Sequence, residues 1–110
     1  MHMSMHPPYD PALRQLLIQA CKETPNVTFK EKSTVVAIEG PNFSSYAENK
    51  VFINWGCTTI GMTQAPEVIL AKELGLPYAA VAIVTDDICW KEDGQCLRWL
   101  LRSEDSLVCI

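Results

Sequence analysis

The middle of this chain alternates between short apolar segments and polar, turn-forming clusters. The apolar segments and the clusters that directly follow them are residues 34–38 and 39–45, residues 58–61 and 62–67, and residues 78–84 and 85–87. Apolar runs of this length, ended by Gly, Pro, Asn, Asp and Ser, are typical of strands. In an open α/β sheet, ligands bind outside the carboxyl ends of the strands. The polar clusters at these strand ends therefore predict a pocket.

Helices with recognisable start signals precede and separate these strands. Asp10 has the form of an N-cap and Pro11 that of a first helical residue, which predicts a helix to about residue 22. Ser45 and Glu48 have the spacing of a capping box, in which two side chains satisfy free backbone N–H groups at a helix start.

The apolar sides of the second and third helices are expected to face inward. In the second helix, which Gly56 should end, these positions are Ala47, Val51, Phe52 and Trp55. The third helix should open at Pro66 and close at Gly75, with inward positions at Val68, Ala71 and Leu74.

The order helix, strand, helix, strand, helix, strand predicts an α/β fold with a mostly parallel sheet flanked by helices. Residues 78–84 are nearly all apolar and suit a strand buried on both faces, as in a parallel sheet. The tail is less regular. Leu97, Leu100 and Leu101 have the spacing of one side of a short helix, and residues 108–110 fit no predicted element.

Composition narrows the function classes. A chain of 110 residues fits one small domain. The net charge of −4 and the scattered Lys and Arg argue against nucleic acid, and no apolar run is long enough for a membrane. The N-terminus lacks the pattern of a signal peptide. The five cysteines form no C-x-x-C pair and both histidines lie near the N-terminus, so we expect no metal site and favour free thiols in a reducing cytosol.

Several motifs resemble those of methylthioadenosine phosphorylases. Residues 38–48 (IEGPNFSSYAE) resemble the family's E-G-P-x-F-S-S-x-A-E signature, and residues 61–73 (GMTQAPEVILAKE) resemble its M-T-x-x-P-E-V-x-L-A-K-E segment. Residues 85–90 (TDDICW) resemble its T-D-x-D-C-W stretch, and residues 2–9 resemble an H-x-P-M…P-F run. The resemblance covers nearly residues 2–92.

This resemblance implies a partial phosphorylase-type fold and a pentosyltransferase activity. The family cleaves methylthioadenosine with phosphate as co-substrate and no cofactor, giving adenine and 5-methylthioribose 1-phosphate. It also implies a homo-oligomer, a trimer in the family, in the cytoplasm or, as second choice, the nucleus. Residues 1–92 should form the C-terminal portion of a phosphorylase-like domain and residues 93–110 a divergent tail. The family's glycine-rich loop, Arg-His pair and upstream Thr for phosphate have no counterpart here, so we expect the chain alone to be inactive.

Asp86 is the candidate catalytic residue. The resemblance places it beside purine N7 and the 6-amino group, where a carboxyl group favours the protonated leaving base. From its position after a strand alone, a turn or N-cap Asp would be the commoner interpretation.

The other candidate site residues also follow from the resemblance. Phe43 and Ser44 would contact the purine, Met62 would lie under the ribose, and Thr85 would belong to the same substrate pocket. Thr63 would contact phosphate. The structural alternatives are a hydrophobic staple for Phe43, a core position for Met62 and an ordinary cap for Thr63.

The chain departs from the family at the purine end of the pocket. The family's second purine-binding carboxylate falls on Ile88, which cannot accept a hydrogen bond. Asp87 stands one residue early, where an extended backbone directs the side chain to the other side. Thr58 stands where the family usually has Asp.

Two other functions stay open. The chain could be a non-catalytic fragment or isoform that associates with full-length subunits. It could also be a relative of the 6-oxopurine nucleoside phosphorylases, although these carry Glu and Asn where this chain has Ser44 and Asp86.

Overall fold

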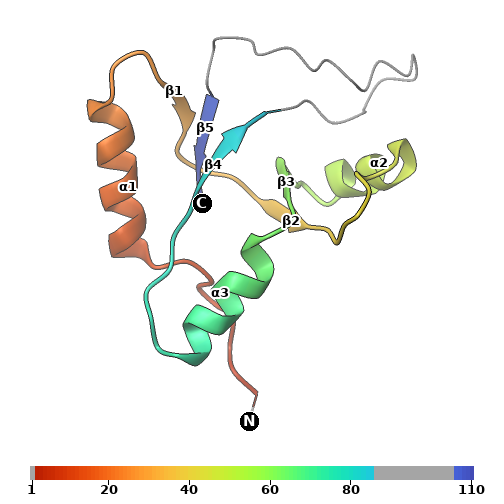
Figure 1. Ribbon diagram of the computed structural model, residues 1–110, viewed down its shortest axis with the longest axis horizontal. Coiled ribbons are helices and arrows are strands. Elements are labelled where there is room, and N and C mark those ends of the chain that lie inside the picture. Colours follow the sequence, from red (N-terminus) through yellow and green to blue (C-terminus); the bar gives the residue numbers. More distant parts are fainter. Residues whose placement is uncertain (1, 86–105) are drawn as a thin grey trace.

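This computed structural model describes residues 2–85 and 106–110 of the chain, which contain three helices and five strands (Figure 1). In chain order they are α1 (Pro11–Glu23), β1 (Thr28–Lys30), β2 (Val35–Ala37), α2 (Tyr46–Asn54), β3 (Thr59–Gly61), α3 (Gln64–Glu73), β4 (Val81–Val84) and β5 (Ser106–Cys109).

α1 begins as its sequence predicts. The Asp10 side chain accepts a hydrogen bond from the Leu13 N–H at 2.7 Å, and Pro11 occupies the first helical position. The helix ends at Glu23, where the Thr24 N–H and hydroxyl both donate to the Ala20 carbonyl. Because the cap satisfies a backbone donor that α1 leaves unpaired, it fixes where the helix starts.

The strands form two sheets instead of the single sheet that the order of elements predicts. β2 and β3 pair in parallel, which confirms the first strand–helix–strand unit. The prediction of a second such unit, in which β3 would pair with β4, is wrong. β4 lies in the other sheet, whose order is β1-β5-β4. There β1 and β5 are parallel, and β4 and β5 are antiparallel. The α/β class with mostly parallel pairing is confirmed.

The sequence pattern missed β1 and β5. β1 has one apolar residue, Phe29, between Thr28 and Lys30, and β5 has three consecutive apolar residues after Ser106. Neither strand carries enough alternation to be distinguished from a loop. Pairing decides their conformation, because β5 supplies backbone hydrogen-bonding partners to a neighbour on each side.

The main core lies between α1 and the three-stranded sheet. Ile18 and Cys21 of α1 pack against Cys109 of β5, and all three are buried. Phe29, Val81 and Leu107 extend this cluster. The expectation that residues 78–84 are buried on both faces is wrong, since Ile83 is 66% exposed. α1 covers only one side of this short sheet (Figure 1).

α2 starts with the predicted capping box but does not bury its apolar side. Ser45 accepts from the Glu48 N–H, and the Glu48 carboxylate accepts from the Ser45 N–H at 2.6 Å. Gly56 follows with φ +77°, the left-handed conformation expected after a helix. Trp55, however, is 69% exposed, and Val51 is also exposed, so the predicted inward face is wrong for these residues.

α3 is shifted from its predicted start. It begins at Gln64, so Pro66 lies in the first turn, where its missing N–H costs no hydrogen bond. Gly75 follows the helix with φ +68° as predicted. Val68 is buried, but Leu74 is mostly exposed, so only part of the predicted inward face is confirmed.

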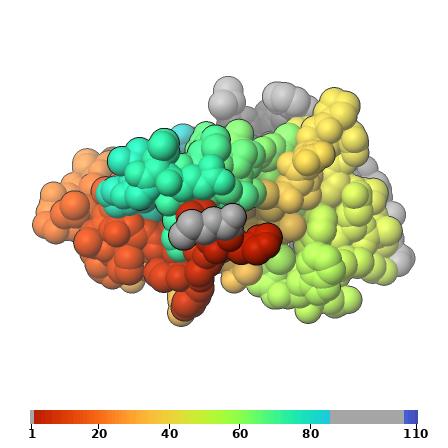
Figure 2. Space-filling view, turned by 90° about the horizontal axis from the view of Figure 1, so that it is seen from below, coloured from red at the N-terminus to blue at the C-terminus, as the bar shows by residue number. Residues whose placement is uncertain are grey.

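The N-terminal segment is held against α3 and the residues that follow it. Lys72 donates a hydrogen bond to the Pro7 carbonyl, and the Asp10 N–H donates to the Tyr78 carbonyl at 2.7 Å. The Tyr9 and Tyr78 rings lie with their centroids 6.0 Å apart. Figure 2 shows the red N-terminal segment beside the teal residues that follow α3.

The Tyr78 hydroxyl donates to the carboxylate of Glu67 in the first turn of α3. Burial and the nearby Glu67 carboxylate raise the pKa of Tyr78 to about 12. A raised phenol pKa favours the protonated form in the folded chain, so the contact stabilises the fold below pH 10.0, the ordinary pKa, and is lost as the pH rises through about 12.

The first prediction concerns the α2 cap. Ser45→Ala should lower the free energy of unfolding by about 1 kcal/mol, because a helix N–H loses its acceptor. Urea denaturation followed by circular dichroism measures this. Ser4→Ala, the same change in the exposed N-terminal segment, is the matched control and should leave stability nearly unchanged. Equal stability of the Ser45→Ala and wild-type chains would contradict a stabilising cap.

The second prediction concerns alkaline pH. Glu67→Gln should lower the pKa of Tyr78, because it removes the carboxylate that disfavours a phenolate. In a titration of phenolate absorbance against pH, the step at the highest pH should then move to a lower pH. Glu73→Gln makes the same change at the end of the same helix and should leave that step in place. A step that Glu67→Gln does not move would mean that Glu67 does not act on Tyr78.

Candidate functional site

The carboxyl ends of β2 and β3 lie side by side and bring two polar clusters to one sheet edge. Ala37 pairs with Gly61 in the parallel register, and the Ile38 N–H donates to the Gly61 carbonyl at 2.9 Å. Residues 39–45 and residues 62–63 therefore leave the sheet at neighbouring points. Four of the predicted site residues, Phe43, Ser44, Met62 and Thr63, follow this edge.

Phe43 presents its ring to solvent, being 71% exposed. A hydrophobic staple would require the ring to pack on α2, so that structural alternative is wrong. The preceding Asn42 side chain donates to the Phe43 carbonyl at 3.0 Å and fixes the backbone of the turn. An exposed aromatic face beside a sheet edge can stack on a planar ring.

Ser44 is held in place by a buried amide that the sequence pattern did not indicate. Its hydroxyl donates to Asn49 Oδ1 at 2.5 Å, and Asn49 is only 1% exposed. A hydroxyl has one proton to donate and two lone pairs. With its proton directed to Asn49, Ser44 can still accept a hydrogen bond from a ligand. The spacing of Asn49 five residues after Ser44, on the capped helix, was the available signal.

Thr63 occupies the N-cap position of α3 but does not cap it. Its backbone is in the helical region, with φ −119° and ψ −33°, and its side chain makes no capping hydrogen bond. The ordinary-cap alternative for Thr63 is therefore wrong. Its side chain is exposed, and Met62 beside it is 38% exposed, so Met62 is not a core residue.

Of the two carboxylates next to this edge, Glu39 is exposed, and Glu48 is held by hydrogen bonds from Ser45. Hydrogen bonds from the Ser45 hydroxyl and N–H hold the pKa of Glu48 below its ordinary value. This carboxylate is engaged in capping, so it is not a candidate proton donor. Across residues 2–85 and 106–110, no group of three potential metal-ligating side chains comes together.

The third predicted cluster belongs to a different sheet. Thr85 directly follows β4 and is exposed. In Figure 1, β2 points to the lower right of the view and β4 to the upper right. The expectation that all three strands belong to one sheet and end at the same edge is therefore wrong, because β4 lies in the sheet of β1 and β5. Asp86 and Ile88 lie outside the described residues, as does the predicted helix at Leu97, Leu100 and Leu101.

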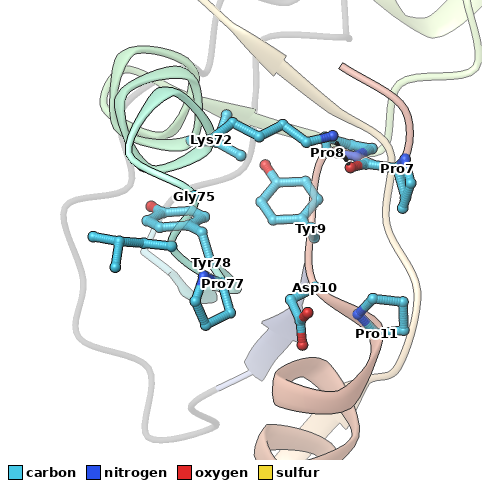
Figure 3. A pocket seen from close by; sticks show the side chains of 11 residues that line it. Pro7, Pro8, Tyr9, Asp10, Pro11, Lys72, Gly75, Pro77 and Tyr78 are labelled. Carbon is cyan, nitrogen blue, oxygen red and sulfur yellow. Dashed lines mark hydrogen bonds between the residues drawn. The ribbon is translucent and has the colours of Figure 1, made fainter. Parts of the chain in front are cut away.

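A cavity of about 510 Å³ lies elsewhere, between the N-terminal segment and the end of α3 (Figure 3). Its walls are mostly prolines and tyrosines, and Lys72 crosses it toward Pro7. None of the predicted site residues that the structure describes lines it. The Lys72 ammonium already donates to a backbone carbonyl, so this cavity offers little specific chemistry. The searched helices of the described chain include none that is long and apolar enough to cross a membrane.

Comparison with known proteins identifies the fold and the sequence pattern. The model of the phosphorylase superfamily matches residues 1–101. S-methyl-5'-thioadenosine phosphorylase of Ciona intestinalis is 51% identical over 92 residues, which are 84% of this chain and 32% of that protein. The Caenorhabditis elegans enzyme of the same name is 49% identical over 92 residues, with the same shares. The chain thus spans about a third of the length of these relatives.

Solved structures agree. Methylthioadenosine phosphorylase from Schistosoma mansoni in complex with adenine has a TM-score of 0.77 and 35% identity, covering 84% of this chain and 38% of that chain. A double mutant of the adenosine/methylthioadenosine phosphorylase from the same organism, also with adenine, has a TM-score of 0.79 and 34% identity, covering 88% of this chain and 40% of that chain. The motifs, the fold and these relatives agree, and the chain belongs to the phosphorylase superfamily as a partial relative of the methylthioadenosine phosphorylases.

Proposed function

We propose that this chain supplies the nucleoside-binding part of a methylthioadenosine phosphorylase site. The β2–β3 register carries the proposal, because it brings residues 39–45 and 62–63 to one sheet edge. Phe43 would stack on the purine, Ser44 would accept a hydrogen bond from it, and Met62 would contact the ribose. Thr85 and Asp86 would complete the pocket.

The hydrogen bond from Ser44 to Asn49 favours adenine over a 6-oxopurine. Adenine carries a 6-amino donor, whereas a 6-oxopurine carries an acceptor there. Because the Ser44 proton is directed to Asn49, the remaining lone pairs suit the amino group. This supports a methylthioadenosine-type substrate over the 6-oxopurine alternative.

Asp86 is the proposed catalytic residue. Phosphorolysis of an N-glycosidic bond leaves electron density on the departing purine, and a carboxyl group near N7 favours the protonated leaving base. Ile88 provides no second carboxylate. We therefore expect purine recognition to rest on Ser44 and Asp86.

Phosphate, the co-substrate of the proposed reaction, needs partners that this residue set lacks. Thr63 is the proposed contact, since its hydroxyl is exposed and not used as a cap. Strong phosphate binding uses charge-assisted hydrogen bonds from Arg or Lys, and neither type occurs among the six proposed residues. We propose that phosphorolysis takes place in a cytoplasmic homo-oligomer, a trimer, or in a complex with longer subunits that supplies these groups.

A second candidate function is a purely non-catalytic association with longer phosphorylase subunits. Its supporting observation is the exposed apolar surface, with Trp55, Leu74 and Ile83 each about two-thirds exposed or more. The radius of gyration is 15.4 Å, whereas a compact domain of this length has about 13 Å. An open chain with exposed apolar side chains favours association.

The third prediction tests nucleoside binding by the folded chain. Calorimetric titration with methylthioadenosine should give saturable heat, and the 6-oxo analogue methylthioinosine should bind roughly tenfold more weakly. Ser44→Ala should weaken methylthioadenosine binding roughly fivefold, because one hydrogen bond is lost. Ser4→Ala should not change it.

Titration in the presence of phosphate tests whether the chain alone binds phosphate as well as the nucleoside. With the chain alone, phosphate should leave the affinity for methylthioadenosine unchanged. If phosphate strengthens binding, the chain holds its own anion site, and Thr63→Val should then remove the gain. A chain that is folded by circular dichroism and gives no heat with either nucleoside overturns nucleoside binding and leaves the association function.

A further inference from the structure

Two cysteine side chains from opposite ends of the sequence face each other in the core. Cys21 Sγ of α1 lies 3.7 Å from Cys109 Sγ of β5. Cys21 is 7% exposed and Cys109 is fully buried, and both belong to the cluster with Ile18. Both are free thiols in this structure. Their sulfur atoms are close enough to react with each other without a change of fold.

Cys109 lies in the strand that holds its sheet together. β5 pairs with β1 on one side and with β4 on the other. It also lies beyond residues 1–101, the part that the phosphorylase model matches. A covalent bond from Cys21 to Cys109 would therefore tie this additional strand to α1 and close a loop of most of the chain.

We propose that Cys21 and Cys109 form a reversible disulfide by exchange with a small-molecule disulfide such as oxidised glutathione. In the first step the Cys21 thiolate attacks glutathione disulfide, forms a mixed disulfide and releases one glutathione thiolate. In the second step the Cys109 thiolate attacks Cys21 Sγ, forms the protein disulfide and releases the second glutathione. The protein dithiol loses two electrons and two protons, and glutathione disulfide is reduced to two thiols.

The surroundings set the order and the pace of these steps. Cys21 retains some exposure and Cys109 has none, so Cys21 is the thiol that meets the oxidant. Burial and the contact with Cys21 raise the pKa of Cys109 to about 11, with Arg14 lowering it and Glu31 raising it. Few Cys109 thiols are ionised near neutral pH, which makes the second step slow. In a reducing cytosol the pair would rest as thiols and close under oxidation.

The fourth prediction is the identity of the bridge. The folded wild-type chain is incubated with oxidised glutathione, quenched with an alkylating reagent, digested and analysed by mass spectrometry. We expect the main cross-linked peptide to join Cys21 to Cys109. Cys57→Ala, which removes a half-buried cysteine before β3, should leave the yield unchanged. Cys109→Ala should stop the reaction at glutathione bound to Cys21.

Two further measurements test for the bridge: the stability of the chain in urea and the rate of cross-linking at different pH values. The oxidised chain should unfold at higher urea concentration than the reduced chain, because the bridge restricts the unfolded state. Dithiothreitol should reverse the shift. Below pH 11, the cross-linking step should accelerate roughly tenfold per pH unit as the thiolate fraction rises.

Three results would overturn the Cys21–Cys109 disulfide, and none of them depends on nucleoside binding. Single glutathione adducts on the folded wild-type chain without a Cys21–Cys109 peptide would overturn it. A bridge from Cys21 or Cys109 mainly to Cys57, Cys89 or Cys96 would do the same. So would a Cys21–Cys109 bridge that forms only in urea, because the native core would then not bring the thiols together.

Discussion

The candidate site depends on the parallel pairing of β2 with β3. Each strand has only three residues, yet their register sets Ala37 against Gly61 and so fixes where the following loops begin. A slip of one residue would turn every side chain of the strand to the other face. The hydrogen bonds among Ser33, Thr58 and Thr59 at the opposite end help to hold this register.

Local hydrogen bonds then set what each loop offers at the edge. The capping box anchors the start of α2, and the buried Asn49 fixes the Ser44 hydroxyl from the same helix. Thr63 differs, because its side chain is not used to cap α3. One loop therefore presents a constrained acceptor and an exposed ring, while the other presents an exposed hydroxyl. Such a division is consistent with the proposed roles, in which the first loop contacts the purine and Thr63 contacts phosphate.

The two sheets differ in how they are stabilised. The β1-β5-β4 sheet is covered by α1 and contains the buried sulfur pair. The β2–β3 pair is flanked by α2 and α3, which leave Trp55, Ile69 and Leu70 exposed. Hydrophobic burial is the dominant favourable term in folding, so the α1 side has the stronger core. The sheet edge that we propose to bind the nucleoside belongs to the β2–β3 pair.

The sequence by itself determined the local features of this protein. The Asp10 and Ser45 caps, the glycines after α2 and α3 and the β2-α2-β3 unit depend on neighbouring residues, and motifs within residues 38–48 and 61–73 identified the family. Only the tertiary structure decided that β4 joins β5 instead of β3, that β1 and β5 are strands, and that Asn49 holds Ser44. The reason is physical: caps and turns are satisfied within a few residues, whereas strand pairing and burial depend on partners far away in the chain, which no local pattern specifies.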